Sequence, residues 1–250
     1  MALEFERIYA VWLREVKRFW NSKPRVLGSI GQPLFFLLAL GFGIGSLVPG
    51  LNYVQFIIPG IIAMSLLFSS IFAGVSIIWD REFGFLKEML VAPLSRTSIV
   101  LGRVLGGATA ACFQGLIILA IGALLLGLPH ASPQNVLLSV AFMLLISAGF
   151  VAVGIAIASL LQDVEAFQLI VNFVIFPLFF LSNSLFPTDK LPAWLAEITM
   201  LNPLSWGVGA MREMLVDGSY AGLPAALAVL AAFDVAAILV AGRLFDKTSI

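Results

Sequence analysis

Charged residues are scarce in this sequence. Only 11% of its 250 residues are Asp, Glu, Lys or Arg, and the 14 basic side chains balance the 14 acidic ones. Soluble domains carry about 25% charged residues. A composition that is 61% hydrophobic, with a mean hydropathy of +1.07, therefore predicts an integral membrane protein. Because the chain has no basic excess, we expect no nucleic-acid partner.

The usual residues of catalytic and metal sites are also rare. The single cysteine, Cys112, excludes an intrachain disulfide and lies in an apolar run, where a buried small hydrophobe is expected. The sequence has one histidine, and it lacks His-Glu-x-x-His, the phosphate loop GxxxxGK[ST] and the nucleophile motif GxSxG. We therefore expect no catalytic residue, and no metal or cofactor bound by this chain.

Long apolar runs take the place of such motifs. A membrane core of about 30 Å requires about 20 apolar residues in a helix, and six runs meet this length. They are Val26–Ser46, Phe56–Trp79, Ile99–Leu128, Val136–Leu161, Ala166–Phe186 and Leu223–Arg243. The sequence thus predicts an all-α integral membrane protein with six transmembrane helices in one domain, residues 1–250.

Basic residues are unequally divided between the two sides of these predicted spans. Twelve lie in the N-terminal segment, after the second span or in the tail, whereas only Lys190 and Arg212 lie on the opposite side. Cytoplasmic loops carry the excess of Lys and Arg. We therefore predict that both termini are cytoplasmic.

The N-terminal residues 2–22 show a helical period. An apolar stripe that includes Trp12 runs along one face, and the basic residues Arg7, Arg14 and Arg18 lie on the rest. Such a helix lies in the plane of the membrane interface. The same pattern is also typical of a helix packed on a cytoplasmic partner.

A second amphipathic segment, Asp80–Arg96, separates the second and third spans. Read as one helix, its apolar residues follow spacings of three and four, beside Arg81, Glu82, Lys87 and Glu88. These charges exclude it from hydrocarbon. We predict that it lies at the membrane surface or against another protein.

Residues 187–221 form a long connection before the last span. Asn202-Pro203 is a good helix start, with Asn as the cap and Pro in the first turn, but the apolar residues that follow are too few to span. Short apolar helices interrupted by proline favour re-entrant half-helices. Two amphipathic helices lying on the outer surface are the alternative.

Polar and aromatic residues within the spans are candidates for a transport pathway. Asp234 lies near the middle of the sixth span, where a carboxyl group serves ion coupling or a hydrogen-bonded helix contact. Gln32, Gln114, Gln168 and Asn172 are weaker candidates. Phe176, Phe179 and Phe180 would line a path for an apolar or amphiphilic cargo, or would face lipid.

Two motifs resemble those of the ABC-2 type transport permeases, the membrane subunits of ATP-binding-cassette exporters. The first is their cytoplasmic pattern R-E-x-G-x-L-x-x-L-L-V-x-P, represented by Arg81, Glu82, Gly84, Leu86, Met89, Leu90, Val91 and Pro93. The second is their stretch before the last span, represented by Phe186-Pro187, Leu191–Leu195, Asn202–Leu204 and Arg212. The resemblance covers essentially the whole chain and favours the branch of daunorubicin-resistance-type and nodulation-type permeases.

This resemblance implies a permease in the plasma (inner) membrane of a prokaryote, paired with a second permease copy, as a homodimer or with a sibling. Two ATPase subunits on separate chains, which bind ATP and Mg, would dock beneath the pair. Residues 80–93 would be the coupling helix, with Arg81, Glu82, Gly84, Leu86, Lys87, Glu88, Met89 and Pro93 as its contacts. The half-helices would close the pathway outside through Pro187, Trp194, Asn202, Pro203 and Arg212.

The resemblance further implies export of an amphiphilic molecule, such as a drug-like compound, a lipid or a lipid-linked glycan. The main alternative is an ion-coupled secondary transporter that uses Asp234, which would show inverted internal repeats. A non-transporting membrane scaffold is the third hypothesis, and it would need no ATPase.

Overall fold

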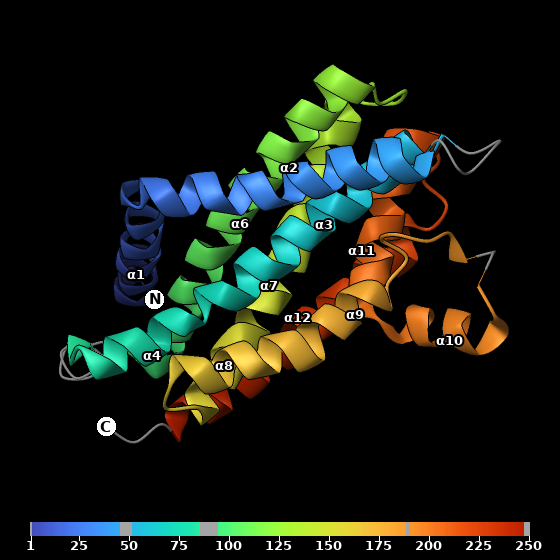
Figure 1. Cartoon of the computed structure of the whole chain (residues 1–250). Helices are drawn as coiled ribbons and strands as arrows, with labels where there is room; N and C mark the ends of the chain where they lie inside the picture. Colours follow the sequence, from blue (N-terminus) through green and yellow to red (C-terminus); the bar gives the residue numbers. More distant parts are fainter. Residues whose placement is uncertain (1, 46–51, 86–94, 189–190, 248–250) are drawn as a thin grey trace.

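The structure, a computed structural model, describes residues 2–45, 52–85, 95–188 and 191–247, and every regular element in these ranges is a helix (Figure 1). The elements are α1 (Ala2–Asn21), α2 (Lys23–Gly45), α3 (Tyr53–Ala73), α4 (Val75–Glu82), α6 (Arg96–Leu126), α7 (Pro133–Leu160), α8 (Val164–Ile170), the π-helical η1 (Val171–Ile175), α9 (Phe176–Phe180), α10 (Ala193–Leu201), α11 (Pro203–Arg212), the π-helical η3 (Glu213–Asp217) and α12 (Leu223–Asp246).

Four helical stretches are long and apolar enough to cross a membrane. They are Tyr53–Glu82, which joins α3 and α4, Arg96–Leu126, Pro133–Leu160 and Leu223–Asp246. The predicted first and fifth spans correspond to the shorter apolar stretches Gly28–Gly43 and Val164–Phe180. The structure therefore confirms an all-helical membrane protein over the described residues, and the count of six spans stays a prediction.

The fifth apolar helix ends earlier than its hydrophobicity predicts. The run was expected to remain helical to Phe186, but α9 ends at Phe180. The Leu181 amide still makes a helical bond to Pro177, but the Ser182 amide and hydroxyl both donate to the carbonyl of Phe179, at 3.2 and 2.6 Å. Local hydroxyl-to-backbone bonds of this kind compete with helix continuation.

The helices α3, α6 and α7 pack against one another and form the core. The backbones come very close where α7 crosses the junction of α3 and α4, because a Cβ placed on Gly74 would lie 2.3 Å from the backbone of Gly154. Small residues permit such contacts in lipid, where close van der Waals packing drives helix association. The crossing therefore requires glycine on both helices.

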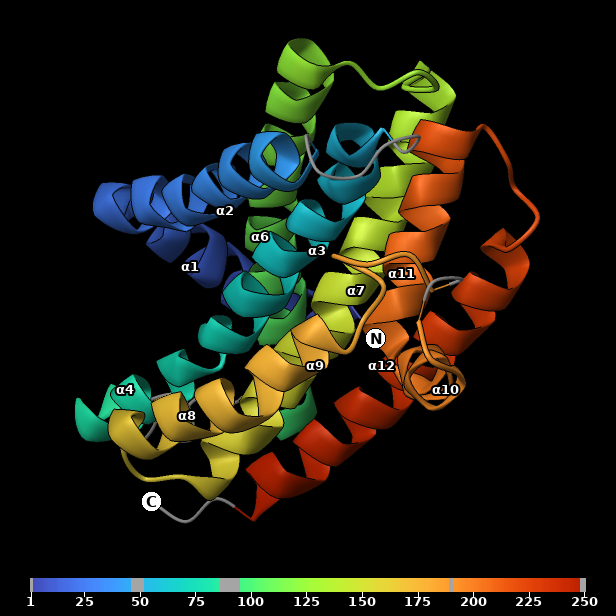
Figure 2. The same cartoon turned by 45° about the vertical axis from the view of Figure 1, so that its right-hand side comes forward.

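The remaining helices surround this core. The helix α12 packs on α7, α1 packs on α6, and α2 packs on α3. The α8–α9 stretch lies along the side of α3 opposite α2, as two views show (Figures 1 and 2). The helix α3 is therefore flanked by α2 on one side and by α8–α9 on the other.

The two short helices before α12 differ in burial. The helix α11 is buried against α3, α7 and α12, whereas α10 is peripheral and leaves Leu201 85% exposed. The burial of α11 supports the re-entrant interpretation for that helix, which stays a prediction.

Candidate coupling site and transport groove

The helix is interrupted within the predicted coupling segment. Asp80, Arg81 and Glu82 form the last turn of α4, and the helix ends before Gly84, whose φ of +78° is left-handed. The prediction of one helix beginning at Asp80 is therefore wrong, because a conformation that favours glycine interrupts it. The predicted contacts Leu86, Lys87, Glu88, Met89 and Pro93 lie outside the described residues.

Asp80 is the centre of a buried ion-pair cluster. Its side chain is only 2% exposed, and its Oδ2 lies 2.5 Å from Nη2 of Arg103, which is itself 3% exposed. Its Oδ1 accepts a hydrogen bond from Arg14 Nη2 at 3.0 Å and lies 3.6 Å from Arg18 Nη1. Arg103 also donates to Ser76 Oγ at 3.0 Å. One carboxylate thus joins α4 to α6 and to α1.

Two other arginines bind the C-terminal ends of spans. Arg81 donates from Nη1 to the carbonyl of Leu161, directly after α7, at 2.8 Å. Arg96, the first residue of α6, donates from Nη1 to the carbonyl of Asp246, the last residue of α12, at 2.5 Å. Cations are favourable at helix C-termini, where backbone carbonyls lack intrahelical partners. Arg81 therefore faces the protein, and the neighbouring Glu82 is exposed.

The N-terminal helix α1 has the predicted amphipathic form and packs on α6. Gly102 and Gly106 of α6 face it, and Trp12 donates from Nε1 to Thr109 Oγ1 at 3.1 Å. Near its start, the carboxylate of Glu4 accepts hydrogen bonds from the hydroxyls of Ser98 and Ser95, which lower the pKa of Glu4, and it pairs with Arg7 at 2.8 Å.

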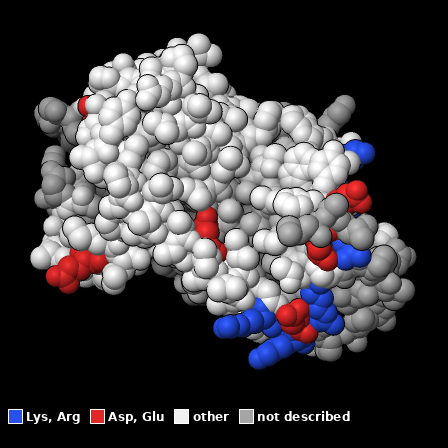
Figure 3. All heavy atoms as spheres, turned by 180° about the vertical axis from the view of Figure 1, so that it is seen from behind, with Lys and Arg blue, Asp and Glu red and all other residues white. Residues whose placement is uncertain are grey.

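The charged residues of these elements lie at one end of the molecule. Seen from behind, charged atoms gather at the end that carries α1 and the C-terminus, and most of the remaining face is uncharged (Figure 3). The hydrogen bonds of Arg14, Arg81 and Arg96 bring the ends of α1, α4, α7 and α12 to this same end. This end matches the predicted cytoplasmic side, whose assignment stays a prediction.

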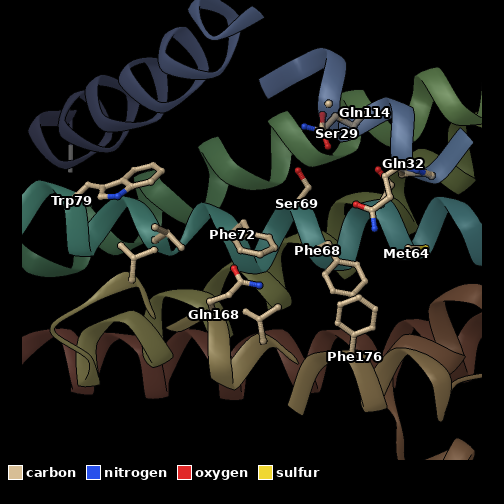
Figure 4. A pocket seen from close by; sticks show the side chains of 16 residues that line it. Ser29, Gln32, Met64, Phe68, Ser69, Phe72, Trp79, Gln114, Gln168 and Phe176 are labelled. Carbon is tan, nitrogen blue, oxygen red and sulfur yellow. The ribbon is translucent and has the colours of Figure 1, made fainter. Parts of the chain in front are cut away.

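A groove of about 660 Å³ runs along α3 between α2 and the α8–α9 stretch (Figure 4). Aromatic side chains of α3 and α9 line it, and amide and hydroxyl side chains lie among them. Its lining residues include Ser29, Gln32, Ser65, Phe68, Ser69, Phe72, Trp79, Gln114, Gln168 and Phe176. The groove therefore combines an apolar surface with hydrogen-bonding groups inside the hydrophobic part of the molecule.

Some polar atoms at this groove have no protein partner. Ser65 Oγ and Gln114 Oε1 are buried and have no hydrogen-bond partner among the described residues. An unpaired buried polar group costs about 1–3 kcal/mol. The groove therefore holds hydrogen-bonding capacity that the described part of the chain does not use.

The weaker polar candidates Gln32, Gln114 and Gln168 all line the groove, but only one of the predicted pathway phenylalanines does. The ring of Phe176 does so, with its centroid 4.8 Å from that of Phe68 (Figure 4). Phe179 is buried in the core beside it, and Phe180 is exposed on the outside of α9. The predicted contribution of Phe179 to an open path therefore does not agree with its burial.

Asp234 lies away from the groove, at the contact of α12 with α7. Its side chain is 7% exposed, and a Cβ placed on Gly149 of α7 would lie 2.3 Å from Asp234 Oδ1. The absence of a side chain at position 149 therefore leaves room for the carboxyl group. This placement agrees with a helix contact, the second of the two interpretations of Asp234.

Two of the predicted outer residues, Asn202 and Pro203, form the start of α11. Asn202 caps α11 by accepting from the Leu204 amide at 3.0 Å and donates to the carbonyl of Leu178 at 2.7 Å, and Pro203 occupies the first turn. These two local predictions are confirmed.

Arg212 ends α11 and ties it to two other parts of the chain. It donates from Nη2 to the carbonyl of Asn183 at 2.9 Å and lies 3.7 Å from the ring centroid of Phe56. Pro187 is half-buried and Trp194 is exposed on α10. Trp194 is thus separate from the buried residues of the predicted gate.

Sequence reasoning missed Asp80 and Arg103 as a site. Both lie at the edge of long apolar runs, where they were interpreted as interface charges. A signal was present, because a carboxylate and a guanidinium at the facing ends of two consecutive spans can pair. The three arginines that converge on one carboxylate could not be identified without the packing of α1.

The comparisons with known proteins agree with this architecture. The family model described as ABC-2 type transporter matches residues 6–216. The transport permease ycf38 of Cyanophora paradoxa is 31% identical over 217 residues, which cover 82% of this chain and 74% of that protein. Nodulation protein J of Rhizobium leguminosarum bv. viciae is 27% identical over 244 residues, 95% of this chain and 93% of that protein. This multi-pass membrane protein therefore belongs to the ABC-2 type transporter family of transport permeases.

Proposed function

We propose that this chain is the permease subunit of an ATP-binding-cassette exporter and forms the translocation pathway for an amphiphilic substrate. Two copies pair, and two ATPase subunits on separate chains bind ATP and Mg²⁺ and dock at the end that carries α1 and α4. The chain lies in the inner membrane of a prokaryote with both termini in the cytoplasm. The family of the chain supports an ATPase partner, and the groove along α3 supports the substrate class.

The observation that carries the proposal is the chemistry of the groove. The rings of Phe68, Phe72 and Phe176 provide apolar contact area, and the glutamines from three different helices provide amide groups at the same walls. The unpaired Ser65 Oγ and Gln114 Oε1 add acceptors without partners. A molecule with both an apolar body and hydrogen-bond donors would use these features together, as small-molecule sites with a few placed polar groups do.

The faces beside the groove support pairing with a second copy. The helix α2 exposes Phe35, Leu38 and Phe42, and the α8–α9 stretch exposes Leu169, Phe173 and Phe180. These exposed apolar residues lie on the two helices that flank the groove. A second permease placed against them would close the groove into a path and would leave the other apolar faces to lipid.

The coupling end supports docking of an ATPase. Phe83 and Phe85 lie on either side of the Gly84 turn, and both are exposed, next to the exposed Glu82. Aromatic side chains are enriched at the centre of protein interfaces, and charged residues lie at the rim. Nucleotide-driven coupling requires a contact that differs in free energy between two ATPase states, and we expect this turn to make that contact.

The test is ATP-dependent transport by the reconstituted complex. The permease is co-expressed with a candidate ATPase subunit on a separate chain, and inside-out vesicles are assayed with a cationic amphiphilic dye, a fluorescent phospholipid or a polyprenyl-linked glycan. We expect uptake of one class with ATP and none with a non-hydrolysable analogue. Transport by the permease alone, driven by an ion gradient, would contradict the proposal.

Groove variants locate the pathway. Gln114→Leu and Gln168→Leu each remove an amide from the groove, and we expect a five- to tenfold loss of transport efficiency, the equivalent of one hydrogen bond of about 1 kcal/mol. Gln134→Leu is the matched control, because Gln134 is exposed at the start of α7 and does not line the groove. Equal losses in all three variants would show that the groove is not the path.

Ion coupling through Asp234 is the alternative function. The position of Asp234 against Gly149, in a helix contact, gives it no access to the groove. We expect Asp234→Asn to retain ATP-dependent transport. Complete loss of transport in a correctly inserted Asp234→Asn protein, together with dependence on the proton gradient, would favour the alternative.

A further inference from the structure

We propose that Asp80 is a positioning residue that makes α1 and α6 move together with the coupling turn. The proposal rests on the proposed function, because it concerns how a push from an ATPase reaches the spans. In this proposal Arg14 and Arg18 transmit the movement of Asp80 to α1, and Arg103 transmits it to α6.

The position of Asp80 on α4 is the first step. Asp80 lies two residues before the end of α4 at Glu82, and a helix rises about 1.5 Å per residue, so about 3 Å along the axis separate it from the end of the helix. Phe83 then joins this last helical turn directly to Gly84. A displacement of the turn therefore carries Asp80 with it.

The chemistry of the contact is the second step. The bonds at 2.5 Å to Arg103 and at 3.0 Å to Arg14 are charge-assisted and directional. Because Asp80 and Arg103 are both buried, separating them removes a close partner from each buried charge, and removing the partner of a buried charge is strongly unfavourable. When α4 moves, the arginines are therefore expected to follow the carboxylate.

The charge balance is the third step. Arg14, Arg18 and Arg103 approach one carboxylate, and Glu15 lies with Arg18 at a small cavity of about 30 Å³ beside Ser76. Without Asp80 the three guanidinium groups would repel one another at the junction of α1, α4 and α6. The carboxylate is therefore the element that holds this junction closed.

The hydrogen bonds of Arg81 and Arg96 to helix C-termini extend the same arrangement. Arg81, adjacent to Asp80, holds the end of α7, and Arg96 holds the end of α12 on the far side of the coupling segment. Asp80, Arg81, Arg96 and Arg103, which make these contacts, all lie at the ends of the coupling segment or within two helical turns of them. Motion of the segment would thus reach α1, α6, α7 and α12 through side chains on its own flanks.

The experiment compares transport with ATP hydrolysis in the assembled complex. Asp80→Asn keeps the size of the side chain and removes its charge. We expect the ATPase to co-purify within twofold of the wild-type amount, hydrolysis to continue, and the ratio of molecules transported to ATP hydrolysed to fall at least tenfold. Asp163→Asn is the control, because Asp163 is an exposed cap of α8 that asparagine can replace, and its ratio should stay unchanged.

A distance measurement separates transmission from mere stability. In a Cys112→Ser background, spin labels on exposed sites of α1 and α4 report their separation with and without ATP. We expect an unchanged separation in the wild-type complex, since the two helices move together, and a change of several ångströms in Asp80→Asn. A purely structural role would change the amount of folded protein and would not produce a nucleotide-dependent change in this separation.

The outcomes are distinct. A wild-type ratio in an assembled Asp80→Asn complex overturns the inference and leaves the proposed function intact, whereas failure of any ATPase to bind the wild-type permease overturns the proposed function. If Asp80→Asn does not accumulate, Arg14→Gln carries the test, because Arg14 reaches Asp80 from a partly exposed position. A normal ratio in Arg14→Gln, with helices that do not separate, would equally overturn the inference.

Discussion

Replacing Gly84 tests whether the shape of the coupling turn governs ATPase binding. Gly84 has φ +78°, and a Cβ placed there would meet no atom of the described residues within 4 Å, so we expect a substitution to act through the backbone. An L-residue in the left-handed region costs about 1–2 kcal/mol, and a β-branched residue is a strong outlier there. Gly84→Val should therefore reduce the population of the observed turn about 5- to 30-fold.

The assay is the affinity of the purified ATPase for the reconstituted permease. We expect Gly84→Val to weaken binding by the same 5- to 30-fold factor, and Gly84→Asn to bind almost as the wild type does, since asparagine tolerates this conformation. Gly242→Val is the size control, because Gly242 also has open space around it but an ordinary helical backbone. Wild-type affinity in Gly84→Val, or an equal loss in Gly84→Asn, would refute the reasoning.

Three further substitutions test the packing around these sites. Gly154→Ala should lower the thermal unfolding temperature in detergent and cost about 1–3 kcal/mol, because its Cβ would lie 2.5 Å from the backbone of α3; an unchanged unfolding temperature would contradict the close crossing. Arg212→Met should cost about 1.5–3 kcal/mol by the same measurement, since it removes a charged hydrogen bond to Asn183; a cost near zero would contradict its role in the outer closure. The Ser98 hydroxyl is the main cause of the lowered pKa of Glu4. The ionised carboxylate of Glu4 therefore stabilises the contact between α1 and α6 above the unfolded pKa of about 4.3. This stabilisation is lost as the pH falls through the lower folded pKa. Protection factors of α1 amides, which are corrected for the pH dependence of intrinsic exchange, should therefore fall on acidification in the wild type but not in Glu4→Gln, and equal acid responses would contradict the role of this carboxylate.

Local patterns were enough to predict much of the helical structure. The period of residues 2–22 predicted α1, and the Asn202-Pro203 pair predicted the start of α11, because capping depends on residues close in sequence. The apolar runs predicted membrane helices, since length and hydrophobicity determine whether a segment can span. The motif around Gly84 was sufficient to predict the family.

The boundaries within these runs were less predictable. The end of α9 at Phe180 depends on a serine hydroxyl that turns the chain in the middle of an apolar stretch. The break at Gly84 divides a segment whose amphipathic period continues across it. In both cases one local backbone conformation ends the helix although the apolar pattern continues. Periodicity alone does not distinguish such an interrupted helix from a continuous one.

The sequence by itself thus determined that this protein is a helical membrane permease and where its amphipathic segments lie, because those properties depend on composition and on neighbours within a few turns. Only the tertiary structure decided that Asp80 binds Arg103, 23 residues away, and Arg14, 66 residues away. It likewise decided that glutamines from three helices border one groove while Asp234 does not. A helical period identifies which face of a helix is buried, but the partner on that face is set by how distant helices pack.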